Sequence, residues 1–205
     1  ELVVLDPALP VGHLAPALGV PYAIVAHGAE ITVPGRLPGV RYLLGRVLRN
    51  ADFVITAGGY PAREASRTAG APLTTIEIPP GVDQSRFVPR DLEERMRYRE
   101  GLGLSQDPLV VGVSRLVPRK GFDVAIEAVG SLRQEIPGIQ LAIVGAGRDR
   151  RRLERISQKS NSPVKFLGRV ADSELPSVFA MGDLFVMPCR NRWGGLEQEG
   201  FGIVF

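Results

Sequence analysis

The sequence contains a single cysteine, Cys189, so the chain cannot form an internal disulfide. A lone cysteine is typical of proteins that work in a reducing compartment. No apolar run approaches the ~20 residues that a membrane-spanning helix requires, and no signal peptide is visible. The spacing of zinc fingers and the aromatic signature of RNA-binding domains are also missing. These absences argue against a disulfide-stabilised, a membrane-spanning or a nucleic-acid-binding protein.

The composition is that of a globular protein with a mild excess of positive charge. Of the 205 residues, 44% are hydrophobic and 23% are charged, and this length allows one or two domains. The net charge is +3 and the sequence pI is about 9.4. A mild excess of this kind fits an anionic small molecule or an anionic membrane surface as the partner.

Both ends of the sequence resemble cut ends. The chain begins at Glu1, without methionine, directly before a strand-like run, and it stops inside the apolar run of residues 202–205. A natural domain rarely ends in a core element. We therefore expect a fragment that folds poorly and is inactive by itself.

Short apolar runs alternate with segments of helical period along the whole chain. This alternation predicts an α/β protein with parallel sheets and right-handed crossovers. The expected strands are residues 2–5, 22–26, 52–56, 74–78, 109–113, 140–144, 164–167 and 184–187. The expected helices are residues 11–18, 36–50, 61–68, 91–100, 122–134, 148–159 and 171–181.

A proline-rich stretch divides this pattern. Residues 79–83 read Pro-Pro-Gly-Val-Asp, in which two prolines stiffen the chain and a glycine permits a sharp turn. We expect a linker here, and hence two Rossmann-like parallel-sheet domains, residues 1–85 and 86–205, both incomplete in this chain.

A basic loop follows the strand at residues 109–113. It carries Arg115, Arg119 and Lys120, and a helical segment begins after Gly121. Ligands of open α/β sheets bind at the carboxyl ends of strands, and cations before a helix start suit a phosphate or pyrophosphate. Solvated surface charges are the alternative interpretation, because most lysines and arginines are exposed.

Three further features leave two interpretations each. His27 follows the strand at residues 22–26, where it can bind a polar ligand or only a neighbouring carbonyl. The glycines of Gly145-Ala146-Gly147 would let the backbone approach a ligand, but Arg150 stands where the dinucleotide fingerprint needs its third glycine.

The third feature is the amphipathic helix expected at residues 36–50. It has a basic face and an apolar face, which fits either a helix packed on the core or one on an anionic membrane. The apolar face holds Val40, Leu43, Leu44, Val47 and Leu48, and the basic face holds Arg41, Arg46 and Arg49.

Four segments together resemble a known family. They are His27-Gly28-Ala29-Glu30, the run from Ser114 to Gly121, Phe166-Leu167-Gly168-Arg169-Val170, and the run from Gly195 to Phe205. In this order they resemble the retaining glycosyltransferases of the GT-B fold, family GT4, and in particular the subgroup of phosphatidylinositol mannosyltransferases. The resemblance covers nearly the whole chain.

The resemblance implies a role for four side chains. Arg115 and Lys120 would stabilise the charge that develops on the departing diphosphate. Glu199 matches the first glutamate of the family's Glu-(seven residues)-Glu motif, which contacts hydroxyls of the donor sugar. His27 matches a histidine that reaches the transferred sugar. The second glutamate of the motif would fall just past Phe205 and is absent.

The resemblance also implies main-chain contacts with the donor nucleotide. These would come from Gly168, Arg169 and Val170 beside the nucleobase and from Gly200, Phe201 and Gly202 beside the phosphates. The family needs no metal and no other cofactor, and no Asp-x-Asp metal motif is present. Under this resemblance, residues 1–85 belong to the acceptor-side domain and residues 86–205 to the domain that binds the sugar nucleotide.

The leading hypothesis is thus an enzyme that moves mannose from GDP-mannose to a phosphatidylinositol-mannoside-type lipid. It would be cytoplasmic, with peripheral contact to the inner face of the plasma membrane. One alternative is a family GT4 transferase with another nucleotide sugar and a soluble acceptor. Two alternatives of other classes are an NAD-dependent oxidoreductase, against which the incomplete glycine fingerprint argues, and a non-catalytic binding module.

Overall fold

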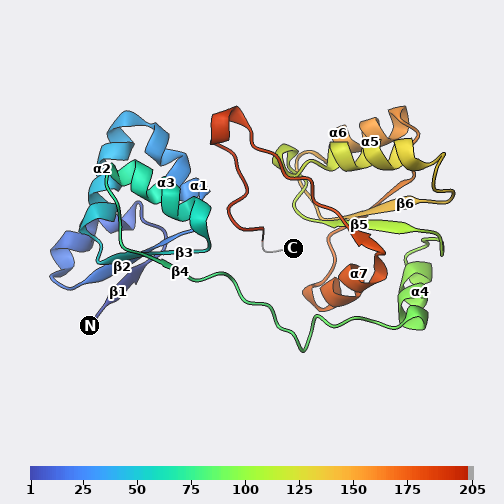
Figure 1. Ribbon diagram of the computed structural model, residues 1–205, viewed down its shortest axis with the longest axis horizontal. Helices are drawn as coiled ribbons and strands as arrows, with labels where there is room; N and C mark the ends of the chain where they lie inside the picture. Colours follow the sequence, from blue (N-terminus) through green and yellow to red (C-terminus); the bar gives the residue numbers. More distant parts are fainter. Residues whose placement is uncertain (203–205) are drawn as a thin grey trace. The chain divides into compact units, whose positions relative to one another are not determined.

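We describe the protein from a computed structural model, in which the structure describes residues 1–202 and only the backbone of Pro16 and Leu18. The Cα positions divide it into two compact units. The first holds Glu1–Gly81 together with residues 191–202, and the second holds Val82–Arg190. Each unit contains one four-stranded sheet (Figure 1). The predicted α/β class with two parallel sheets is therefore confirmed.

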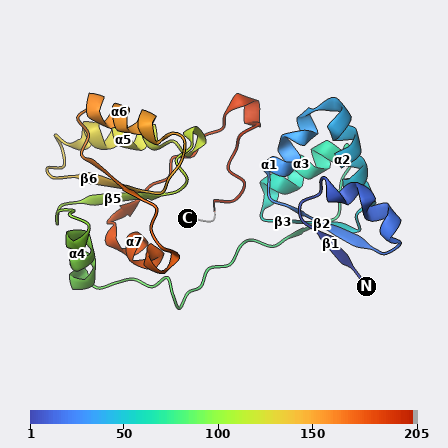
Figure 2. The ribbon, with the colours of Figure 1, turned by 180° about the vertical axis from the view of Figure 1, so that it is seen from behind.

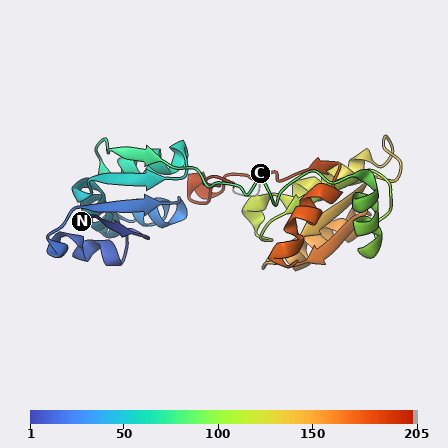
Figure 3. The same ribbon diagram turned by 90° about the horizontal axis from the view of Figure 1, so that it is seen from below.

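The first sheet has the strand order β1-β2-β3-β4, and every neighbouring pair is parallel. Figure 3 shows these strands side by side with one direction. The strands are β1 (Val3–Leu5), β2 (Tyr22–Ala26), β3 (Phe53–Thr56) and β4 (Thr75–Glu77). The helices of Glu1–Gly81 are α1 (Ala29–Thr32), α2 (Pro38–Asn50) and α3 (Gly59–Ala69), with 3-10 helices η1 (Val11–Leu18) and η2 (Pro34–Arg36).

The core of the first unit lies between β2, β3 and the helices α2 and α3. Ile24 and Val54 face each other across the strand pair and are buried with Leu44 and Leu48 of α2. The strand β1 lies at the sheet edge, and its Val4 is 51% exposed. Edge strands have one open side, so the sequence pattern alone overestimated the burial of this strand.

The helix α2 buries a narrower face than its sequence predicts. Leu44, Val47 and Leu48 are buried, whereas Val40 and Leu43 are 39% and 40% exposed. Tyr42 on the same helix is 72% exposed. The outer face of α2 thus presents apolar side chains beside its arginines.

The second sheet has the order β7-β6-β5-β8 and is also parallel throughout. Its strands are β5 (Leu109–Val113), β6 (Gln140–Val144), β7 (Val164–Gly168) and β8 (Leu184–Phe185). Its helices are α4 (Leu92–Gly101), α5 (Phe122–Leu132), α6 (Arg150–Lys159) and α7 (Leu175–Met181), with the 3-10 helices η3 (Pro118–Lys120) and η4 (Asp172–Glu174). A further 3-10 helix, η5 (Trp193–Gly195), belongs to the first unit.

Helices cover both faces of the second sheet. In Figures 1 and 2, α5 and α6 lie on one face and α4 and α7 on the other. Two apolar clusters fill these layers, one with Phe122 and Ile126 of α5 and one with Val178 and Met181 of α7. All five residues of the central strand β5 are consequently buried, as expected for a parallel sheet covered on both sides.

A buried arginine connects α4 to the sheet. Arg99 is fully buried, and its guanidinium donates to the carbonyl of Met181 at 2.7 Å and to the carboxylate of Asp183 at 2.9 Å. The same carboxylate oxygen accepts from the N–H of Leu109 at 2.8 Å. Burial alone would raise the pKa of Asp183, but these hydrogen bonds and the charge of Arg99 hold the pKa below its usual value.

We predict that Asp183→Asn lowers the free energy of unfolding by about 1–2 kcal/mol at neutral pH, because Arg99 loses its counter-charge. A carboxyl whose pKa is lowered by folding stabilises above its unfolded pKa of ~4 and loses this contribution as the pH falls through the lowered value. The difference between wild type and variant in urea unfolding should therefore shrink below about pH 4.

Glu93→Gln provides the matched control. Glu93 and Arg97 form an exposed pair on the same helix, at 3.8 Å, so its loss should leave the unfolding free energy unchanged. An Asp183→Asn variant as stable as Glu93→Gln at pH 7 would contradict the prediction.

Candidate functional site

A cavity of about 250 Å³ lies at the carboxyl ends of β5, β6 and β7. It is built entirely from the second unit. Its lining residues are Val113, Ser114, Arg115, Val144, Gly145, Ala146, Arg169, Val170 and Leu175. The strand order reverses at β5, because β6 and β7 extend to one side and β8 to the other. Open α/β sheets bind ligands at such a point, so this cavity is the candidate site of the second unit.

Backbone hydrogen bonds fix the loops around the cavity. The N–H of Ser114 donates to the carbonyl of Val144 at 3.0 Å, and the N–H of Leu116 donates to that of Ala146 at 3.0 Å. The N–H of Gly145 donates to the carbonyl of Gly168 at 2.6 Å. The loops after β5, β6 and β7 are thereby held together, and the cavity is largely preformed.

The glycines after β6 have a different role from the one expected. A Cβ on Gly145 would lie 1.9 Å from the carbonyl oxygen of Ser114, and one on Gly147 would lie 2.2 Å from that of Leu116. Gly145 also has a φ of +136°, which side chains rarely permit. These glycines let the loops after β5 and β6 pack against each other, so their contact is with protein.

The cavity combines apolar walls with positive charge. Val113, Val144 and Leu175 contribute apolar surface, and the side chains of Arg115 and Arg169 are exposed. A guanidinium can bind two phosphate oxygens at once. The pairing of apolar walls with two guanidinium groups suits an anionic ligand that also carries a flat or apolar part.

Lys120 is not among the described residues that line this cavity. Its side chain is 5% exposed, and its Nζ lies 3.6 Å from the sulfur of Met187. The structure thus brings Arg115 together with Arg169 and Val170, and it places Lys120 in a buried position behind the basic loop. Gly168 contributes its carbonyl to the loop hydrogen bonds.

Two residues that the sequence analysis missed hold the basic loop. Arg190 donates to both carboxylate oxygens of Asp123, at 2.7 and 2.6 Å, and to the carbonyl of Pro118 at 3.0 Å. Arg152 donates to the same carboxylate at 2.9 Å. Burial alone would raise the pKa of Asp123, but the hydrogen bonds from Arg190 and Arg152 lower it. An acidic residue in the first turn after a basic loop was the available signal.

In the first unit, His27 pairs with an aspartate. Its Nε2 lies 3.1 Å from Oδ2 of Asp6, and the two side chains are 58% and 52% exposed. Each residue directly follows a strand, Asp6 after β1 and His27 after β2. The carboxylate of Glu30 accepts from the N–H groups of His27 and Gly28. Asp6 was missed, although its position after a predicted strand was a signal.

The segment that contains Glu199 packs against His27. A Cβ on Gly200 would lie 2.5 Å from the carbonyl oxygen of His27, so only glycine fits here. The hydroxyl of Tyr60 also donates to the carbonyl of Gly195 at 3.4 Å. Residues 191–202 therefore group with the first unit, whereas we expected residues 86–205 to form one domain.

The expected site residues thus fall into two groups. His27, Glu199, Gly200, Phe201 and Gly202 belong to the first unit, and Arg115, Lys120, Gly168, Arg169 and Val170 belong to the second. The shared role of these groups stays a prediction. Residues 203–205, which continue the glutamate segment, lie outside the described residues.

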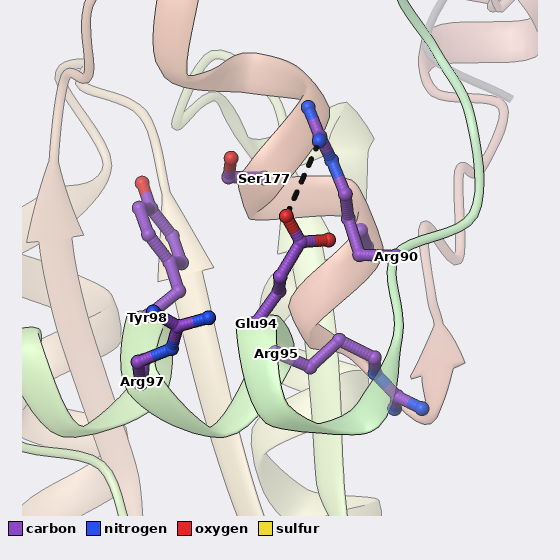
Figure 4. Close-up of a pocket in the computed structure, with 7 residues that line it drawn as sticks. Arg90, Glu94, Arg95, Arg97, Tyr98 and Ser177 are labelled. Carbon is purple, nitrogen blue, oxygen red and sulfur yellow. Dashed lines mark ion pairs between the residues drawn. The ribbon is translucent and has the colours of Figure 1, made fainter.

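A second cavity, of about 420 Å³, lies between α4 and α7. Figure 4 shows Arg90, Glu94 and Tyr98 along its α4 side and Ser177 on α7. Its cations are partly neutralised, because Arg90 lies 3.7 Å from Glu94 and Arg95 lies 2.6 Å from Asp183. None of its described lining residues follows a strand, so it is separate from the candidate site.

We predict that Gly145→Ala disrupts the loops of the candidate site. The new Cβ meets a backbone carbonyl that cannot move cheaply, and the positive φ adds strain, so the unfolding free energy should fall by about 3 kcal/mol. Gly101→Ala is the matched control, because nothing lies within 4 Å of its Cβ position at the end of α4. Equal urea midpoints for the two variants would refute the prediction.

Solved structures confirm the fold. The structure of Anabaena HepE in complex with UDP and glucose matches with a TM-score of 0.80 at 23% identity, over 100% of this chain and 55% of that chain. Sucrose-phosphate synthase from Thermosynechococcus elongatus matches with a TM-score of 0.71 at 25% identity, over 99% of this chain and 52% of that chain. The GT-B fold expected from the resemblance is therefore confirmed.

Similar sequences have more specific names. A GDP-mannose-dependent alpha-(1-6)-phosphatidylinositol monomannoside mannosyltransferase of Mycolicibacterium smegmatis is 41% identical over 87% of this chain and 47% of its own length. The protein of the same name from Mycobacterium tuberculosis (strain H37Rv) is 38% identical over 100% of this chain and 54% of its own length. The chain thus spans about half the length of the curated relatives that it matches.

A family model connects these findings to the sequence. The model described as "Glycosyl transferases group 1" matches residues 94–205, which is more than half of the chain. This range contains Arg115, Lys120, Arg169 and Glu199. The chain therefore belongs to the group 1 family of glycosyltransferases.

Proposed function

We propose that the protein transfers mannose from GDP-mannose to a phosphatidylinositol-mannoside-type lipid, with retention of the anomeric configuration. The observation that carries the proposal is the cavity at the ends of β5, β6 and β7, with Arg115 and Arg169 beside apolar walls. The choice of mannose, GDP and lipid is supported by relatives named for that reaction at 38–41% identity.

The cavity fits the two chemical parts of a nucleotide. Val170 and the backbone at Gly168 and Arg169 would contact the nucleobase, and the apolar walls would exclude water from it. Arg115 would bind two oxygens of the diphosphate, because its planar guanidinium matches that geometry. Arg169 adds a second positive charge to the same cavity.

The reaction breaks the bond between the anomeric carbon and the diphosphate oxygen, and the bonding electron pair stays on that oxygen. Arg115 and Lys120 would stabilise this charge more strongly in the transition state than in the ground state, which lowers the barrier. Lys120 suits this role only through a buried Nζ, where low polarity strengthens its charge. The acceptor hydroxyl then forms the new bond to the anomeric carbon.

The remaining residues would hold the hexose and the phosphates. Glu199 would accept hydrogen bonds from donor-sugar hydroxyls, and His27 would bind the transferred sugar. The N–H groups of Gly200, Phe201 and Gly202 would add dipoles toward the diphosphate. Because side-chain cations supply the charge in this scheme, we propose that transfer requires no metal or other cofactor.

The lipid acceptor implies contact with a membrane, and α2 is the surface we propose for it. Its outer face combines the exposed apolar groups of Val40, Tyr42 and Leu43 with Arg41 and Arg46. Such a helix binds at the interface of anionic lipids. The described helices contain none that is long and apolar enough to cross a bilayer.

We predict that the full-length protein releases GDP from GDP-mannose in the presence of the lipid acceptor, and that Arg115→Ala lowers kcat by about 10²–10³-fold. Loss of one preorganised donor to a developing charge typically costs this much. Arg115→Lys should recover only part of the rate, because an ammonium cannot bind two oxygens in the guanidinium geometry. Coupled detection of the released nucleotide gives the rate.

Arg151→Ala is the control, because this arginine lies exposed on α6 outside the cavity. Its rate should equal that of the wild type, and a chelator should leave both unchanged. Release of UDP from UDP-sugars in preference to GDP would replace the proposed donor. Failure to turn over any nucleotide sugar would end the proposal.

We also predict that Leu43→Ser reduces binding to vesicles that contain anionic phosphatidylinositol, measured by sedimentation. The substitution removes apolar contact from the outer face of α2, and the side chain is 40% exposed, so folding should be unaffected. Val124→Ser, which changes a 47% exposed side chain of α5, should bind like the wild type. Equal binding by both variants would exclude this surface.

A further inference from the structure

The pair of Asp6 and His27 arises from the parallel pairing of β1 with β2. Leu5 lies opposite Ile24 in the register, so the residues that follow both strands emerge at the same edge of the sheet. The Oδ2 atom of Asp6 then lies 3.1 Å from Nε2 of His27. A hydrogen bond of this length holds the imidazole from one side.

The backbone of His27 is held separately. Glu30 accepts hydrogen bonds from the N–H groups of His27 and Gly28, and Gly200 packs against the carbonyl of His27. The carboxylate of Glu30 is thus occupied by the main chain, whereas the carboxylate of Asp6 faces the ring. Asp6 is therefore the described acidic group that orients the imidazole.

The chemistry of the two groups fixes the position of the ring proton. An ionised carboxylate only accepts hydrogen bonds, so a neutral imidazole beside it must carry its proton on Nε2. Nδ1 is then unprotonated and can only accept. A sugar hydroxyl can donate to such a nitrogen, and the direction of that hydrogen bond is set by Asp6.

We propose that Asp6 is a positioning residue that keeps neutral His27 in the Nε2–H tautomer and presents Nδ1 as an acceptor for a hydroxyl of the transferred hexose. The proposal rests on the proposed function for the identity of the ligand. Both side chains are more than half exposed, so their hydrogen bond contributes little to the stability of the fold. A positioning role accounts for the pair where a stabilising role does not.

The first experiment measures the ring and needs no turnover. Full-length protein is labelled with ¹⁵N-histidine, and His27 is assigned by the loss of its signals in His27→Gln. Long-range ¹H–¹⁵N spectra at neutral pH should show a protonated Nε2 and an unprotonated Nδ1 in the wild type. In Asp6→Ala both nitrogens should shift toward the averaged values of a tautomer mixture.

The second experiment is a double-mutant cycle on the transfer rate. Asp6→Asn should lower kcat by about three- to tenfold, the worth of one hydrogen bond, with little change in KM. In a His27→Ala background the same substitution should have no further effect, because Asp6 acts through the ring. Asp52→Asn is the control, since Asp52 bonds to the backbone N–H of Tyr22 and should leave the rate unchanged.

The outcomes separate the two proposals. Identical ring spectra for wild type and Asp6→Ala, or equal losses from Asp6→Asn with and without His27, would overturn the positioning role. Absence of turnover with every nucleotide sugar would overturn the proposed function alone, and the ring spectra would then still decide whether Asp6 fixes His27. Thermal unfolding of the Asp6 variants should match that of the wild type.

Discussion

The parallel pairing of β5 with β6, and of β6 with β7, places three strand ends at one edge of the second sheet. Everything at the candidate site depends on this pairing, because it brings residues 113–115, 144–146 and 169–170 together from distant parts of the chain. The burial of β5 on both faces makes the arrangement rigid. A parallel sheet thus turns sequence spacing into a preformed site.

The loops at this edge are held by two kinds of interaction. Glycines at 145 and 147 allow backbone to touch backbone, at positions where any Cβ would collide with a carbonyl. Beyond them, Asp123 binds Arg190 and Arg152 and connects the start of α5 to the basic loop. Because its neighbouring cations are engaged by this carboxylate, the exposed charge of the cavity is concentrated on Arg115 and Arg169.

The sequence predicted the elements well because their signals are local. β2, β5 and β6 have the predicted bounds, since apolar runs bounded by turn residues mark strands on their own. The exposure of Val4, Val40 and Leu43 was not predictable in this way, because it depends on which elements lie at an edge. The pairing of Asp123 with Arg190 joins residues 67 positions apart, and no local pattern reveals it.

The site residues illustrate the same limit from the side of function. A resemblance in four short segments identified Arg115, Arg169 and His27, but it assigned roles without geometry. The structure adds that Lys120 is buried beside Met187 and that His27 has a carboxylate partner. Both facts arise from packing between segments that are far apart in sequence. The residues that act on a ligand can therefore be read from motifs, whereas those that hold and orient them emerge only from the fold.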